Sequence, residues 1–290
     1  MKKLAAFALT LIVSSALNAQ EIPGKVVLQQ GDIIKVTTEM TSSNTQSMMG
    51  GDPMEMKTNT NSYTELEVKE VLTDGYKMSQ TMKKMKMDFD GFGQKTTYDS
   101  ESKEKQDNPF VKQLAEKMNV PEDIKLGFDG KLIEEEANED KKASGKDGKD
   151  GKRGGGGGRG GMRMMGMGNN SSAESAFLVV PKDAVTKGGW EESTEKDGLK
   201  TRRKYTLGAV MGNMATVTVQ SQTKGDLEMN RGGMPMTTKI NTLTEEMIIV
   251  NMSTGKVQMH TVNMTNNSKT IMNDKESPST GKTTITTTVE

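Results

Sequence analysis

The sequence has no cysteine and one histidine, His260, and these absences narrow the chemistry that the chain can carry. Without cysteine there is no disulfide framework and no thiol nucleophile. A catalytic triad needs a base beside a nucleophile and a third group that orients it. A lone histidine in a strand-like stretch is typical of a strand residue half in solvent. We therefore predict no catalytic residues, and the sequence indicates no cofactor.

Aromatic residues and net charge are also scarce. Aromatic side chains are 4% and hydrophobic side chains 32% of the 290 residues, so methionine, with 25 residues, must supply much of the buried apolar area. The 39 basic and 39 acidic residues balance, which leaves no field to steer the chain onto nucleic acid or an anionic membrane. Two Arg-Gly-Gly steps, at Arg153 and Arg159, lack neighbouring aromatic residues that would stack bases. We expect no nucleic-acid partner.

Residues 1–19 predict a secretory signal peptide. Lys2 and Lys3 form its positive segment, an apolar run follows from Leu4 to Val13, and small residues lead to cleavage after Ala19. No cysteine follows the apolar run, so we do not expect a lipoprotein. No later apolar run reaches the length of a membrane span. We expect a periplasmic or secreted protein without an integral membrane segment after cleavage.

Alternating apolar and polar residues predict a first β-rich region over residues 20–133. The runs Ile34–Met40 and Thr64–Val68 have this period, and Asp74-Gly75 suits the turn of a hairpin. The phase of the alternation changes near Lys83-Lys84. This change predicts a β-bulge, and bulges curve sheets.

Within this region, residues 109–118 predict one short amphipathic helix. Asn108 suits the N-cap and Pro109 the first helical position, and the apolar residues that follow share one face. Val120-Pro121 ends the pattern, because the residue before a proline avoids the helical conformation.

The composition changes at residue 134. Residues 134–175 are rich in glycine, lysine and methionine, and glycine at this density costs too much backbone entropy to order without strong contacts. We predict a disordered insertion there. Residues 176–290 return to strand patterns, including Phe177–Val180 and Thr283–Val289, and we expect them to form a second β-rich region of the same sheet.

The predicted fold class is therefore mainly β. It is a curved antiparallel sheet or half-barrel with at least one short amphipathic helix and a disordered glycine-rich insertion. The two β-rich regions are partly alike, because Gly51-Asp52-Pro53-Met54 matches Gly233-Met234-Pro235-Met236. Internal duplication is one interpretation, and chance similarity between threonine-rich strands is the other.

Methionine clusters suggest an alternative function as a soft-metal binder. Thioether sulfur suits Cu(I) or Ag(I). The candidate ligands fall in two groups: Met162, Met164, Met165 and Met167, and Met48, Met49, Met54 and Met56. Most other methionines fall on strand faces, where packing explains them, so we assign no metal site.

Four stretches carry a resemblance to known proteins: Val36–Met87, Tyr98-Asp99-Ser100, Asp129–Leu132, and Val180-Pro181 with Gly188–Trp190. Together they resemble an uncharacterised family of exported, β-rich envelope proteins from Bacteroidota, over most of the chain outside the insertion. The chain departs from that pattern at Gly188–Trp190, where an acidic residue usually follows the first glycine. The resemblance implies no activity and no functional residues.

A looser fold analogy is to periplasmic lipoprotein-carrier proteins, in which a curved antiparallel sheet and a helical lid enclose an apolar ligand. It implies a non-enzymatic envelope protein that binds a hydrophobic small molecule or a lipid in a curved sheet. The alternatives are the Cu(I)/Ag(I) binder and a hydrolase whose carboxylates meet only in the fold. The sequence names neither the ligand-binding residues nor the oligomeric state.

Overall fold

The structure, a computed structural model, describes residues 24–47, 51–102, 108–133, 171–231 and 234–290. Within these residues, an 11-stranded antiparallel sheet dominates the fold, which confirms the predicted fold class. Its strands are β1 (Ile33–Ser47), β2 (Pro53–Val71), β3 (Gly75–Gly91), β4 (Gln94–Asp99), β5 (Pro121–Gly127), β6 (Gly189–Lys196), β7 (Leu199–Met211), β8 (Met214–Arg231), β9 (Met234–Asn251), β10 (Val257–Met272) and β11 (Lys275–Val289).

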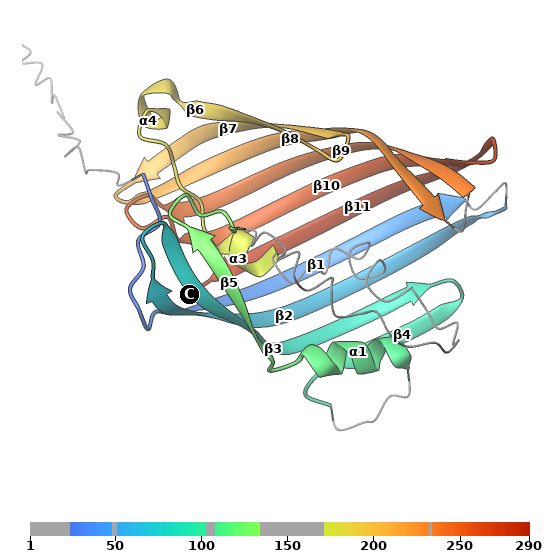
Figure 1. The fold of residues 1–290 in the computed structure, drawn as a ribbon, viewed down its shortest axis with the longest axis horizontal. Helices are drawn as coiled ribbons and strands as arrows, with labels where there is room; N and C mark the ends of the chain where they lie inside the picture. The colour runs from blue at the N-terminus through green and yellow to red at the C-terminus, as the bar shows by residue number, and fades with distance from the viewer. Residues whose placement is uncertain (1–23, 48–50, 103–107, 134–170, 232–233) are drawn as a thin grey trace, which may run out of the picture.

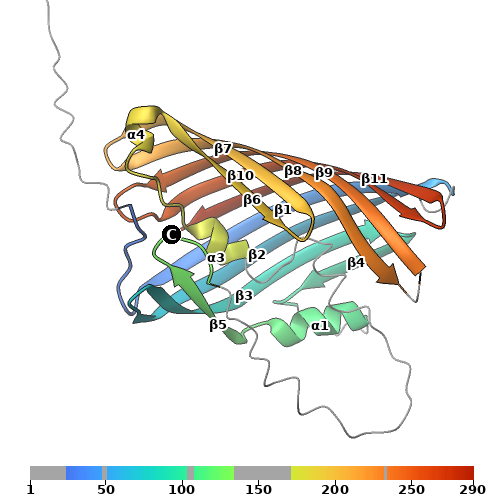
Figure 2. The same cartoon turned by 45° about the horizontal axis from the view of Figure 1, so that its top comes forward.

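The first and last strands of the chain meet inside the sheet. The strand order is β4-β3-β2-β1-β11-β10-β9-β8-β7-β6, and β5 pairs with the first part of β3. Most neighbours are consecutive in the chain, and the pairing of β1 with β11 joins the two halves. The path ends at β6 on one side and at β4 and β5 on the other, so the sheet is open. Figures 1 and 2 show it curving into a trough, with α3 and β5 on the concave side.

Short helices accompany the sheet: α1 (Pro109–Lys117), α3 (Ser171–Ala176) and α4 (Ala184–Lys187). Helix α1 confirms the predicted helix to within one residue, and its Val111 and Leu114 pack on Met85 and Met87 of β3. No helix in the described part of the chain is long and apolar enough to cross a membrane.

Strand alternation assigns one set of side chains to the concave face. In β1, Ile34, Val36 and Met40 are buried, whereas Lys35 and Glu39 are exposed. At one end of the trough, β1, β2 and β3 form a core with the segment before β1, with β5 and with α3. A second core lies on the same end of β7, β8 and β9 under residues 178–184. The covered end of the trough is thus apolar.

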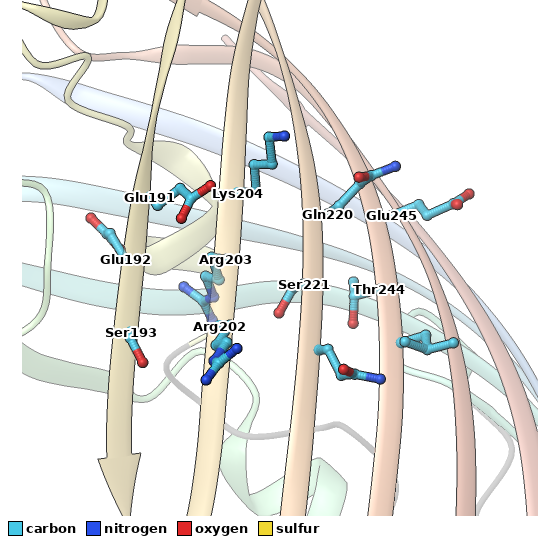
Figure 3. Close-up of a pocket in the computed structure, with 12 residues that line it drawn as sticks. Glu191, Glu192, Ser193, Arg202, Arg203, Lys204, Gln220, Ser221, Thr244 and Glu245 are labelled. Atoms are coloured by element: carbon cyan, nitrogen blue, oxygen red, sulfur yellow. The ribbon is translucent and has the colours of Figure 1, made fainter.

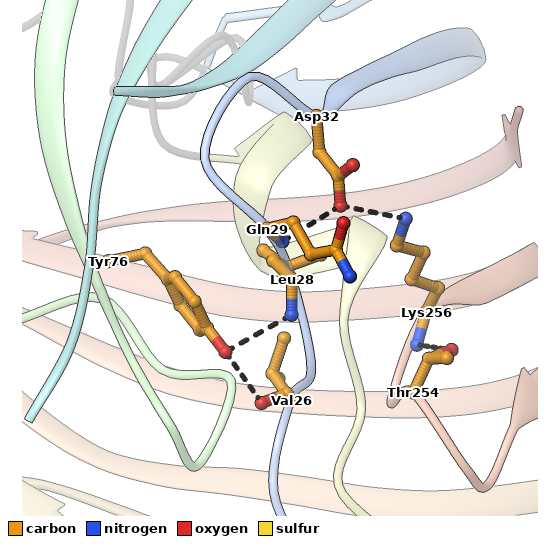
Figure 4. Close-up of polar contacts among 7 residues, drawn as sticks. All are labelled: Val26, Leu28, Gln29, Asp32, Tyr76, Thr254 and Lys256. Atoms are coloured by element: carbon orange, nitrogen blue, oxygen red, sulfur yellow. Dashed lines mark hydrogen bonds and ion pairs between the residues drawn. The ribbon is translucent and has the colours of Figure 1, made fainter. Parts of the chain in front are cut away.

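Tyr76 of β3 hydrogen-bonds the segment before β1, at Val26 and Leu28, and so holds it against this covered end. Its hydroxyl accepts a hydrogen bond from the backbone N–H of Leu28 at 3.1 Å and donates one to the carbonyl oxygen of Val26 at 2.9 Å (Figure 4). The ring packs edge to face on Phe128 at 5.3 Å between centroids. Because the hydroxyl satisfies two buried backbone groups, one side chain holds the segment in place.

The predicted bulge is confirmed and can be placed at one residue. Tyr63 lies opposite Lys84, but Thr64 lies opposite Met82, so Lys83 is the extra residue. The insertion changes which residues of β3 face the trough. Gln80 and Met82 face it before the bulge, and Met85 and Met87 after it.

Two sequence predictions need correction. Phe177–Val180 is not a strand: Phe177 forms an isolated bridge to Lys256, and the segment crosses the end of the sheet with its side chains in the two cores. The predicted disordered insertion extends too far, because residues 171–175 belong to α3, where Ala173 is fully buried. Residues 134–170 of that prediction, and the predicted signal peptide, lie outside the described residues.

Candidate functional site

A cleft of about 770 Å³ lies between the concave face of β6–β10 and the segments that cover it. The cover consists of the turn 129–132 after β5, part of α3, and residues 177–179. The floor consists of inward-facing side chains from five consecutive strands. The cleft therefore depends on the curvature of the sheet and on cover segments that are distant from the floor in sequence.

Aliphatic and aromatic side chains form much of the lining. On the floor they are Trp190, Leu199, Tyr205, Ile240, Ile248, Val257, Val262 and Met264, and on the cover Leu132, Phe177, Leu178 and Val179. Trp190 of β6 stacks on Tyr205 of β7, with ring centroids 4.3 Å apart and planes 5° from parallel. Such a lining suits the apolar part of a ligand.

A cluster of polar side chains lies within this lining near the edge of the sheet. The register places Glu192 of β6 opposite Arg203 of β7. The hydroxyl of Tyr205 donates a hydrogen bond to Oε2 of Glu192 at 3.3 Å, and the Lys131 ammonium on the cover lies 3.5 Å from Oε1 of the same carboxylate. Arg203 also hydrogen-bonds Tyr205. The cover and the floor are thus linked by an ion pair.

His260 and Glu246 form a second polar pair in the cleft. Nε2 of His260 lies 2.7 Å from Oε2 of Glu246, and the side chains are 14% and 16% exposed. His260 is therefore more enclosed than the half-solvated strand residue that the sequence suggests. The sequence alone does not reveal this pair, because the two residues are 14 positions apart and meet only through the pairing of β10 with β9.

The environment fixes the charge of two of these groups. Burial raises the pKa of the Tyr205 hydroxyl, and the nearby carboxylates Glu192 and Glu246 raise it further, against the effect of Arg203. Burial lowers the pKa of Arg203, but Tyr205, Glu246 and Glu192 outweigh that effect and the net pKa is raised. At neutral pH the cleft therefore holds a neutral phenol beside a charged guanidinium.

Hydroxyl and amide side chains line the concave face both within the cleft, where Thr201, Thr223 and Thr242 belong to the floor, and beyond it. Several form hydrogen bonds between strands: Thr201 with Thr223 at 2.8 Å, Thr242 with Asn266 at 2.9 Å, Ser42 with Thr283 at 3.0 Å and Ser279 with Asn44 at 2.8 Å. Cross-strand pairs of this kind stabilise a sheet face that is open to water.

A second hollow, of about 660 Å³, lies along β6–β9 (Figure 3). Its lining is mostly charged or amide-bearing, and alternation places Glu191, Lys204 and Gln220 on the opposite side of the strands from Arg203 and Ser221. This surface has the composition of a solvated outer face. The cleft on the concave face is the better candidate because it is covered and combines apolar with polar groups.

The structure locates two of the candidate methionine ligands. Met54 and Met56 lie on β2, whereas Met48, Met49, Met162, Met164, Met165 and Met167 lie outside the described residues. Met85 and Met87, which no metal prediction included, are buried beneath α1 and serve as core side chains. Across the described ranges there is no group of three or more His, Cys, Asp and Glu residues that could hold a metal ion.

The fold is an open, curved antiparallel sheet whose concave face is partly covered. Residues 169–257 match a family of unknown function, DUF6263, and this part includes α3, α4 and the strands β6–β9 of the cleft floor. No curated protein matches the chain.

Two solved structures are similar to this chain over most of its length. Lipovitellin, from a structure titled for its lipid–protein interactions, is similar over 89% of this chain with 8% identity and a TM-score of 0.41, and this chain spans 25% of the lipovitellin chain. An outer membrane channel from Pseudomonas putida F1 is similar over 92% of this chain and 98% of its own, with 8% identity and a TM-score of 0.27.

Proposed function

We propose that this chain is an exported, non-enzymatic binding protein that holds the apolar part of a hydrophobic or lipid ligand in the cleft of its concave face. The observation that carries the proposal is a cleft of about 770 Å³ between a five-strand floor and a separate cover, whose walls combine a group of aliphatic and aromatic side chains with hydroxyl and charged ones. Ligand sites are typically clefts of this size with a few placed polar groups.

The polar groups of the cleft favour binding over acid–base chemistry. The Glu246 carboxylate is engaged by His260, and the Glu192 carboxylate by Tyr205 and Lys131. A general acid or base needs access to the proton that it moves. Side chains that already hold one another in place instead give the cleft a fixed shape.

Native mass spectrometry of the protein purified from the envelope of the producing cell tests the proposal, combined with solvent extraction of the bound molecules. The expected result is one apolar or amphipathic molecule per chain. Val262→Phe adds bulk to the floor of the cleft, and we expect it to lower the occupancy. Ile249→Phe, on the outer side of β9, is the matched control and should retain the ligand.

Absence of any bound apolar molecule in the folded wild-type protein would overturn the proposal. Equal occupancy in the wild-type, Val262→Phe and Ile249→Phe proteins would show that the molecule sits elsewhere, and would also overturn it. Circular dichroism of the three proteins establishes that each is folded before the occupancies are compared.

A further inference from the structure

The charges that line the cleft are unevenly balanced. Four carboxylates and two permanent cations line it, together with the single histidine: Asp129, Glu174, Glu192 and Glu246, against Arg203 and Lys131, with His260. The Lys131 ammonium is also already paired with Glu192. A carboxylate or phosphate head group would therefore meet an excess of negative charge, which opposes its binding.

The floor of the cleft carries a row of uncharged polar side chains, which continues beyond the cleft at Asn266. Thr201, Thr223, Thr242 and Asn266 lie side by side in the register of β7, β8, β9 and β10. Neighbouring strands are about 4.8 Å apart, so the row presents hydrogen-bonding groups at that interval. Each threonine hydroxyl has one donor and two acceptor positions, and the bonds within the row use only some of them.

Gly281 of β11 occupies the next position of this row and, because it has no side chain, leaves a gap there. The register places it between Asn266 of β10 and Asn44 of β1. An added Cβ would come no closer than 3.6 Å to any neighbour, and Gly281 is not among the positive-φ glycines. Neither the backbone nor packing requires glycine here, and its effect is to open space between two amide side chains.

We propose that the ligand is an amphiphile with an uncharged, hydroxyl-rich head group, such as a glycosyl group. The tail lies against the apolar part of the cleft around Trp190, and the head group hydrogen-bonds the row formed by Thr201, Thr223, Thr242 and Asn266 on the polar part of the floor. This inference rests on the proposed function, because it assumes that the cleft holds the tail. Excess acid in the cleft excludes an anionic head, and the hydroxyl and amide row matches a neutral polyol.

The test compares three probes that share a twelve-carbon tail and differ in the head group: dodecyl maltoside, laurate and dodecyltrimethylammonium, each below its critical micelle concentration. Trp190 is the only tryptophan and lines the cleft, so its fluorescence reports occupancy directly. Maltose without a tail is the fourth arm. We expect dodecyl maltoside to bind at least about tenfold more tightly than any other probe, a difference of about 1.4 kcal/mol.

The outcomes separate the head group from the cleft itself. If the three tailed probes bind equally, the apolar cleft stands and the inference about the head group fails. If laurate or dodecyltrimethylammonium binds most tightly, the head group is charged and the inference also fails. If maltose alone binds as tightly as dodecyl maltoside, the ligand is a free glycan and the inference of an amphiphile fails. If none of the four binds, the proposed function fails with it.

Variants of the row supply a second readout. Thr223→Val combined with Thr242→Val removes two hydroxyls and keeps β-branched side chains, and we expect dodecyl maltoside binding to weaken about three- to tenfold per hydroxyl while laurate binding stays unchanged. Thr218→Val, exposed on the outer side of β8, is the matched control. Unchanged dodecyl maltoside affinity in a folded double variant would overturn the role of the row.

Discussion

The hydroxyl of Tyr76 provides the sharpest test of how the covered end of the trough is held. Tyr76→Phe removes one oxygen atom and keeps the ring in its edge-to-face contact with Phe128. The substitution leaves the backbone N–H of Leu28 and the carbonyl oxygen of Val26 without their partner, and Tyr76 is only 3% exposed. The loss is therefore one of hydrogen bonding and not of packing.

The magnitude follows from the two backbone groups left unsatisfied. A buried polar group without a partner costs about 1–3 kcal/mol. Some relaxation of the segment before β1 will let water reach one of the two groups. We expect the free energy of unfolding of Tyr76→Phe to fall by about 2–4 kcal/mol.

Urea unfolding followed by far-UV circular dichroism measures this loss. Tyr63→Phe is the matched control, because the Tyr63 hydroxyl donates to a side-chain carboxylate, Glu65, at 3.0 Å and leaves no buried backbone group behind. We expect the control to lose less than about 1 kcal/mol. A Tyr76→Phe protein within about 0.5 kcal/mol of wild type, the size of ordinary surface effects, would show that the hydroxyl does not hold the segment before β1 in place.

Three further predictions concern the sheet. Gly225→Ala should lower the free energy of unfolding, measured with urea, by more than about 2 kcal/mol, because the φ of Gly225 is +155° and an added Cβ would overlap the carbonyl oxygen of Gly198. Gly281→Ala is the control, because an added Cβ there meets no atom closer than 3.6 Å, and it should be neutral or slightly stabilising. Burial raises the pKa of Tyr205 above its ordinary value of 10.0, so the stability linked to the neutral phenol is complete below that pH and is lost as the pH rises through the higher pKa. Urea midpoints between about pH 9.5 and 11.5 should accordingly fall less in Tyr205→Phe than in wild type. Deletion of Lys83 should either abolish the cooperative unfolding transition or lower the free energy of unfolding by several kcal/mol, because removing the bulge turns one part of β3 to the wrong face. Unchanged stability would contradict the observed register of β2 on β3.

Features that depend on local sequence were predictable. The alternation of Ile34–Met40 identifies the buried face of β1, and Pro109 with the apolar face after it identifies α1. The phase change at Lys83 identifies the bulge, because one extra residue in a strand moves every later side chain to the opposite face. Each of these signals lies within one strand, helix or turn.

Features that depend on pairing between distant strands were not predictable. The contact of His260 with Glu246 requires the register of β10 on β9, and that of Lys131 with Glu192 requires the cover to lie over β6. Phe177–Val180 has the composition of a strand, yet its side chains serve two cores and it makes no ladder. Composition reports the burial of a segment and not its partner.

We propose that the cleft on the concave face holds an apolar chain beside Trp190. The most direct measurement is quenching of Trp190 fluorescence by dodecyl maltoside carrying bromine at the end of its tail, with the unbrominated compound as the reference. We predict saturable quenching at one molecule per chain, lost in Val262→Phe and retained in Ile249→Phe. Folded wild-type protein whose Trp190 shows no saturable quenching would contradict the proposal.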